Sequence, residues 1–213
     1  MIIWLWGFLT AQLILSPSQI LDTKDMPENK GSISQENTYT NPTLGLTLVL
    51  PGAWHYFDRT MYTTPQQKQE EEEAEKKALA NCQGPLCGHG EIDVALQTPM
   101  TQPPKMAVYL SAYKLSTEYQ NRERHPLRKF AEIMSVGSMG PHWVSEGELT
   151  AVQLGGKPAY RLIVHNKETA TAKGFLYVAD SNGRVFMLLA VAMSDPEKLQ
   201  MAVEHLKFAS PGN

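Results

Sequence analysis

One stretch decides the fold of this chain: Tyr39-Thr-Asn-Pro-Thr-Leu-Gly-Leu-Thr-Leu-Val-Leu-Pro-Gly-Ala-Trp54. The residues from Leu46 to Leu50 predict a β-strand. Pro51 lacks the N–H that a strand ladder needs and Gly52 favours a turn, so we expect the strand to end there. Trp54 follows as an aromatic anchor for a hydrophobic core. The folded domain is therefore predicted to begin near Tyr39.

The composition is that of a globular domain. The chain has 213 residues, of which 42% are hydrophobic and 19% are charged. This length fits one domain of roughly 150–170 residues with tails, which is large enough to bury one core. The formal net charge is −3, with Lys and Arg scattered along the chain. Without a basic stripe to neutralise phosphates, we expect no nucleic-acid partner.

The N-terminus resembles an export signal. The first eighteen residues carry no charged side chain, and Ile2–Leu15 is almost entirely apolar. This segment is shorter than the about 20 residues of a membrane-spanning helix, and Ser16-Pro17-Ser18 offers the small residues that a signal peptidase requires. We predict a signal peptide over residues 1–18, cleaved before Gln19, and a secreted or periplasmic protein. Because a basic n-region is missing, an uncleaved anchor and a buried helix remain alternatives.

The two cysteines support export. Cys82 and Cys87 flank a Gly84-Pro85 turn, and in an oxidising compartment this spacing predicts a small disulfide-closed loop. A zinc site with His89 is the alternative. Zinc prefers about four ligands, and this cluster offers fewer, so we predict no metal ion and no other cofactor.

Residues 19–38 are polar and show no period, which predicts a disordered spacer. Thr64-Pro65 predicts the start of a highly charged helix that extends to Ala80. Together with the cysteine loop, this helix is predicted to form an insertion at residues 60–90 of the domain. Its charged side chains form a possible interaction surface: Glu70, Glu71, Glu72, Glu73, Lys76 and Lys77.

The rest of the chain alternates between strand and helix patterns. Apolar residues at helical spacing predict one helix around Leu127–Met134 and another ending near Leu206. The sequence Asp180-Ser-Asn-Gly183 predicts a hairpin turn, because Asn-Gly suits positive φ. The strand after it, Arg184–Met193, is apolar on both faces, so we expect it to lie centrally. Five further strands are predicted, at 91–97, 106–113, 148–153, 158–165 and 171–179. The predicted class is α+β, with an antiparallel sheet of about six or seven strands flanked by amphipathic helices.

Three of these features together resemble the superfamily of the photosystem II extrinsic protein PsbP. They are the block Asn41–Trp54, the hairpin Thr171–Val191, and the terminal helix Ser194–Leu206 with Lys207-Phe208 after it. The resemblance covers residues 39–209, with the 60–90 insertion unmatched. A nuclear-import factor that binds the GTPase Ran and many exported bacterial proteins of unknown role share this fold. The resemblance implies an α/β/α sandwich around an antiparallel sheet, and roles in binding and assembly.

No catalytic motif accompanies these features. Neither a Gly-x-Ser-x-Gly elbow nor a His-Glu-x-x-His sequence occurs, and no catalytic residue is predicted. We therefore expect an exported, non-enzymatic binding or assembly domain whose partner is another protein. Membrane contact is expected only through an uncleaved N-terminal segment. A small-molecule or metal-binding envelope protein and an unrecognised hydrolase are the alternatives.

Overall fold

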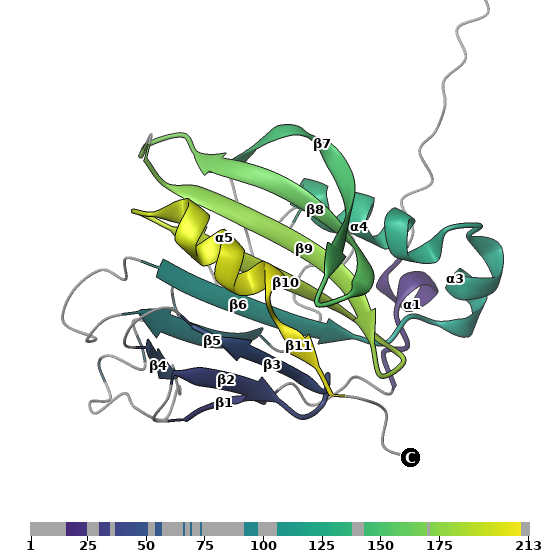
Figure 1. Ribbon diagram of the computed structural model, residues 1–213. Coiled ribbons are helices and arrows are strands. Elements are labelled where there is room, and N and C mark those ends of the chain that lie inside the picture. Colours follow the sequence, from purple (N-terminus) through teal and green to yellow (C-terminus); the bar gives the residue numbers. More distant parts are fainter. Residues whose placement is uncertain are drawn as a thin grey trace, which may run out of the picture.

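The fold is taken from a computed structural model of the chain (Figure 1). The structure describes residues 16–24, 30–34, 37–50, 54–56, 66, 69, 73, 92–97, 106–137, 143–169 and 171–209. For residues 17, 54–56, 92–97 and 136–137 it describes the backbone alone.

The described strands form two antiparallel sheets. The larger sheet has seven strands in the order β4-β5-β6-β10-β9-β8-β7: β4 (Trp54–Tyr56), β5 (Ile92–Gln97), β6 (Met106–Tyr113), β7 (Trp143–Leu154), β8 (Lys157–Asn166), β9 (Lys173–Ser181) and β10 (Arg184–Ala192). The smaller sheet has the order β1-β2-β3-β11: β1 (Ser32–Ile33), β2 (Thr38–Asn41), β3 (Leu46–Val49) and β11 (Lys207–Phe208). The described helices are α1 (Pro17–Ile20), α3 (Thr117–Arg122), α4 (Pro126–Gly137) and α5 (Pro196–Glu204).

The predicted α+β class is confirmed, but the expectation of a single sheet is wrong. The strand predicted over Leu46–Leu50 is β3, which pairs with β2 on one side and with the C-terminal β11 on the other. Its alternate residues Leu46 and Leu48 are almost fully buried, as the sequence pattern requires. That pattern specifies which side chains face the core, but it does not determine which strands pair with one another. The second sheet was therefore not predicted.

The central strands β6, β10 and β9 are buried on both faces of the large sheet, and their side chains alternate between these faces. Phe175, Tyr177 and Ala179 of β9 belong to a core shared with α5 and the small sheet. The intervening Leu176 and Val178 belong to a second core shared with α1, α3 and α4. We call these two sides the α5 face and the α4 face (Figure 1). Burial on both sides explains why the central strands are nearly continuously apolar.

The hairpin predicted around Asp180–Gly183 is confirmed. β9 pairs with β10 from Ser181 opposite Arg184 onward, which leaves Asn182-Gly183 as a two-residue turn. Their φ angles are 53° and 68°, as a type I′ hairpin turn requires. The strand β10 that follows is paired on both sides, with β9 and β6, so its predicted central position is also confirmed.

Ordered residues occur where the sequence predicted a disordered spacer. Ile20 and Leu21 are 0% and 1% exposed, and Leu21 forms an isolated antiparallel bridge with Leu115. The physical reason is local: these two adjacent apolar side chains pack into the α4-face core, although the stretch around them is polar. The chain therefore joins the folded domain well before Tyr39.

Candidate functional site

The most connected polar group in the described structure is the carboxylate of Glu204, at the end of α5. Its Oε1 atom accepts three hydrogen bonds: from Arg161 Nη1 at 2.8 Å, from Gln200 Nε2 at 2.9 Å and from Tyr177 Oη at 3.1 Å. Arg161 is on β8 and Tyr177 on β9, so this one oxygen connects α5 to two strands of the sheet.

The electrostatics of this group favour anchoring over proton transfer. Burial alone would raise the pKa of Glu204, but the hydrogen bonds from Gln200, Tyr177 and Arg161 outweigh it and lower the pKa. The pKa of Tyr177 is raised, first by burial and then by the negative charge of Glu204. The carboxylate is thus a weak base and the phenol a weak acid, the reverse of what general acid–base catalysis near neutral pH uses. We interpret the group as an anchor for α5.

A second polar group lies where the two sheets meet. Ser181 is 1% exposed, and its hydroxyl donates to the carbonyl of Leu44 at 2.7 Å. Lys157 Nζ donates to the same hydroxyl at 3.1 Å and lies 4.2 Å from the centre of the Phe208 ring. This group connects the opening block and the C-terminal strand to the β8 and β9 strands.

A third group lies where the first half of β7 pairs with β8. Glu146 contacts His165 Nδ1 at 3.3 Å and Lys173 Nζ at 3.8 Å, and all three side chains are about 40% exposed. The pairing of β7 with β8 becomes irregular directly after Glu146, and Gly147 has a φ of 86°. This group connects the edge strand β7 to β8 and β9 next to the place where the pairing of β7 with β8 is irregular.

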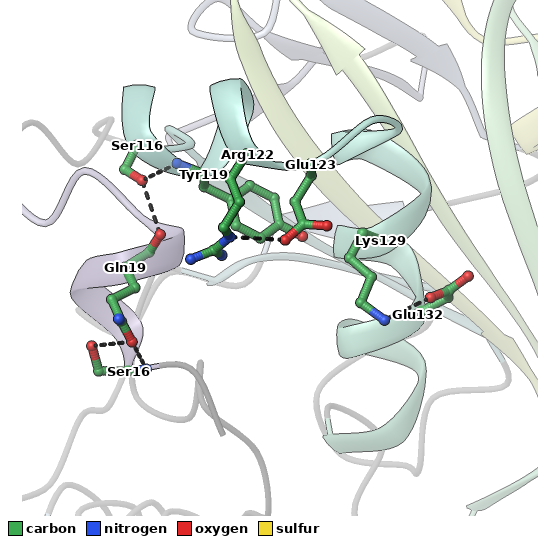
Figure 2. A network of polar contacts seen from close by, with 8 residues as sticks. All are labelled: Ser16, Gln19, Ser116, Tyr119, Arg122, Glu123, Lys129 and Glu132. Carbon is green, nitrogen blue, oxygen red and sulfur yellow. Dashed lines mark hydrogen bonds and ion pairs between the residues drawn. The ribbon is translucent and has the colours of Figure 1, made fainter. Parts of the chain in front are cut away.

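The fourth group is the corner where α1 meets α3 (Figure 2). Ser116 Oγ donates to the carbonyl of Gln19 at 3.0 Å, and the backbone N–H of Ser116 donates to Ile20. The same Ser116 Oγ accepts the N–H of Tyr119 and so caps α3. One serine therefore begins the helix and holds the incoming N-terminal segment.

Tyr119 is buried in the middle of this corner. Its side chain is 0% exposed, and the Arg122 guanidinium lies 5.6 Å from its ring centre. Burial, followed by the charge of nearby Glu123, raises the pKa of its hydroxyl. Within the described part of the chain the hydroxyl has no hydrogen-bond partner, so Tyr119 contributes here mainly through its ring.

Most of the predicted site residues fall outside the described residues. These are Cys82, Cys87, Glu70, Glu71, Glu72, Lys76 and Lys77. Glu73 is described; it is exposed, has helical backbone, and accepts a hydrogen bond from Gln69 Nε2 at 3.3 Å. The structure therefore tests neither the predicted disulfide nor the predicted surface.

The strands on either side of the predicted insertion are described. β4 and β5 are neighbours and pair antiparallel, with Trp54 opposite Gln97 and Tyr56 opposite Ala95. β4 is the last strand at its side of the sheet. Residues 57–91 therefore connect two adjacent strands at an edge, where a turn of two residues is sterically sufficient.

Among the described residues, no group of three or more His, Cys, Asp or Glu side chains is arranged to hold a metal ion. Within the same residues, no helix has both the length and the apolar character needed to span a membrane.

No protein-family model matches this chain, and no curated protein matches it by sequence. The solved structures that are similar to it include the following two. One is LpqN, described as involved in cell envelope biogenesis of Mycobacterium tuberculosis, with a TM-score of 0.44 and 14% identity over 86% of this chain and 91% of LpqN.

The other is the solution structure of cyanobacterial PsbP (CyanoP) from Synechocystis sp. PCC 6803. Its TM-score is 0.44 at 8% identity, over 85% of this chain and 98% of CyanoP. This is the family that the sequence resembles. The likeness concerns the fold, and the roles of LpqN and CyanoP belong to those proteins.

All four of the groups described above were missed by sequence reasoning, for one shared reason. Arg161, Tyr177 and Glu204 lie on different elements and meet only after β8, β9 and α5 have packed together. The only local signal was the spacing of Gln200 and Glu204, which places both on the same side of the last helix.

Proposed function

We propose that this chain is an exported, non-enzymatic binding or assembly domain, and that the insertion at residues 60–90 provides its contact surface. Its expected location is secreted or periplasmic, on the basis of the apolar N-terminal segment. The expected partner is another protein.

One observation carries the proposal. β4 and β5 are paired neighbours, so the sheet can close with a short turn and has no topological need for residues 57–91. Long connections between adjacent elements are uncommon in compact domains, and they often serve binding. Glu73, the described charged residue of this connection, is exposed, which supports a surface role for the charged helix.

The test is to replace residues 58–90 with a short Gly- and Asn-containing turn. We expect the thermal unfolding midpoint of this variant to stay within a few degrees of the parent, because the core residues are unchanged. In parallel, Glu70, Glu71, Glu72 and Glu73 are changed to Gln in the full chain to remove charge while retaining length.

Partners are then compared by chemical crosslinking in the native envelope fraction. Under the proposal, a crosslinked partner of the parent chain is lost with the deletion and weakened by the glutamine variant. An unchanged set of crosslinks with a folded deletion variant would exclude the insertion as the contact surface.

The disulfide between Cys82 and Cys87 is part of the same proposal. It would fix the loop that follows the charged helix and reduce its freedom before binding. Thiol titration of the native exported chain should find no reactive thiol, whereas two reactive thiols would remove the disulfide from the proposal.

A further inference from the structure

The corner formed by α1, α3 and the start of α4 carries an unusual local charge. Four Arg or Lys residues and a single Glu lie between residues 122 and 129, although the chain as a whole has a net charge of −3. The basic side chains are all exposed: Arg122, Arg124, Arg128 and Lys129. We call these four residues the basic corner.

The acidic residues of the corner neutralise only part of this charge. Arg122 Nε contacts Glu123 at 3.0 Å. Arg128 Nε and Lys129 Nζ both contact Glu132, each at 3.2 Å, so that two cations share one carboxylate. Glu118 is the remaining exposed acid of α3. Four basic side chains set against these three carboxylates leave a positive excess of one charge among exposed or partly exposed residues.

The residues directly after the apolar N-terminal sequence are held at this same corner. The sequence is almost entirely apolar up to Leu15, and Ser16 is the first described residue. The backbone N–H of Ser16 donates to Gln19 Oε1 at 2.8 Å. Gln19 in turn accepts from Ser116 at the start of α3, as Figure 2 shows.

The segment that follows is fixed firmly. Ile20 and Leu21 are buried, Asp22 N donates to Lys114 O at 2.8 Å, and the side chains of Asp22 and Lys114 form an ion pair at 3.3 Å. In a chain that keeps residues 1–18, the apolar sequence is therefore followed directly by residues that are fixed beside α3.

We propose that the basic corner is a membrane-facing surface that binds the headgroups of an anionic phospholipid bilayer. Exposed Arg and Lys near an anionic membrane are attracted to it, and a basic patch is an effective second signal beside an apolar segment. The apolar sequence that directly precedes Ser16 favours a bilayer over an acidic protein as the occupant. This surface is separate from the insertion at residues 60–90.

The experiment is vesicle flotation of the purified full chain. Vesicles of phosphatidylcholine alone give the baseline due to the apolar segment, and vesicles that also contain phosphatidylglycerol report the charge-dependent part. We expect tighter binding to the anionic vesicles. Removal of three positive charges should lower the ratio of the affinities for anionic and neutral vesicles by at least about tenfold, since each charge contributes roughly fivefold to the affinity for an anionic surface. Added salt should weaken it.

The test variant carries Arg124→Gln, Arg128→Gln and Lys129→Gln. Its matched control carries Lys30→Gln, Lys198→Gln and Lys207→Gln, which are exposed residues outside the α3–α4 segment and change the net charge equally. Under the proposal the test variant falls to its phosphatidylcholine level, while the control keeps the anionic preference. Equal losses in both variants, or no preference in the parent chain, would overturn it.

Two further measurements keep the result interpretable. Thermal unfolding midpoints close to that of the parent show that both variants fold. The variant with residues 58–90 replaced should retain the full anionic preference. The two proposals can therefore fail separately: loss of partner crosslinks tests the insertion, and loss of the anionic preference tests the basic corner. Loss of the anionic preference on removal of the insertion would assign lipid binding to the insertion and contradict the basic corner.

Discussion

The hydroxyl of Ser181 donates a hydrogen bond to the carbonyl of Leu44 across 2.7 Å, between residues that are 137 positions apart in the chain. Leu44 lies between β2 and β3 of the small sheet, and Ser181 ends β9 in the large sheet. Both residues are buried. This bond therefore joins the block that begins the fold to the hairpin near its end.

Ser181→Ala should destabilise the protein by about 1–3 kcal/mol, because it leaves the buried Leu44 carbonyl without its donor. It also removes an acceptor from Lys157 Nζ. Chemical denaturation measured by circular dichroism checks this. Ser194→Ala is the control, since Ser194 is exposed; equal midpoints for the two variants would contradict a structural role for Ser181.

Gly155 and Gly156 form a matched pair in the β7–β8 turn. Both have positive φ, at 56° and 82°. A Cβ on Gly155 would come 2.5 Å from the Leu206 carbonyl and 3.0 Å from the Phe208 ring, whereas a Cβ on Gly156 meets nothing within 4 Å. Gly156→Ala should cost about 1 kcal/mol for its backbone conformation alone.

Gly155→Ala should cost at least about 1 kcal/mol more than Gly156→Ala, because the backbone carbonyl of Leu206 cannot move aside without shifting the start of β11. Unfolding free energies of the two variants, measured side by side, decide the question. A smaller cost at Gly155 would show that the C-terminal strand does not lie against this turn.

Glu204→Gln should reduce stability near neutral pH by about 1 kcal/mol, a value limited by solvent screening of this partly exposed group. Its pKa is lowered in the folded state, so its stabilising effect is present above the unfolded-state pKa and is lost as the pH falls through the folded-state pKa. The difference between parent and variant should therefore shrink in acid.

Urea unfolding of both chains from neutral pH to acid measures this difference. Combining Glu204→Gln with Arg161→Met in a double-mutant cycle isolates the Arg161 contribution. A difference that grows on acidification would mean that the carboxylate is not stabilised as an anion.

Leu21→Ala should cost about 2–3 kcal/mol, because Leu21 is 1% exposed and packs into the α4-face core. Thr23→Ala, at an exposed neighbouring position, should be nearly neutral. Thermal denaturation compares the two. An unchanged midpoint for Leu21→Ala would mean that this segment belongs to the disordered polar spacer that its composition predicts.

Features encoded by neighbouring residues could be predicted. The Asn182-Gly183 turn, the central strand Arg184–Ala192 and the stripe of α5 depend on local turn chemistry and periodicity, and the structure shows all three. The order of strands in a sheet depends on pairings between distant segments, so the pairing of β3 with β11 was missed. The docking of Leu21 was missed because two apolar residues hardly alter the composition of a polar stretch.

The sequence by itself determined the α+β class, most of the strands and helices of the C-terminal half, and the resemblance to the PsbP superfamily. Only the tertiary structure decided that the opening block forms a second sheet, that Glu204 anchors α5 to Arg161 and Tyr177, and that the N-terminal segment enters beside a basic corner. The reason is physical. Periodicity records which side chain is buried, whereas contacts between distant residues exist only once the packed core has brought them together.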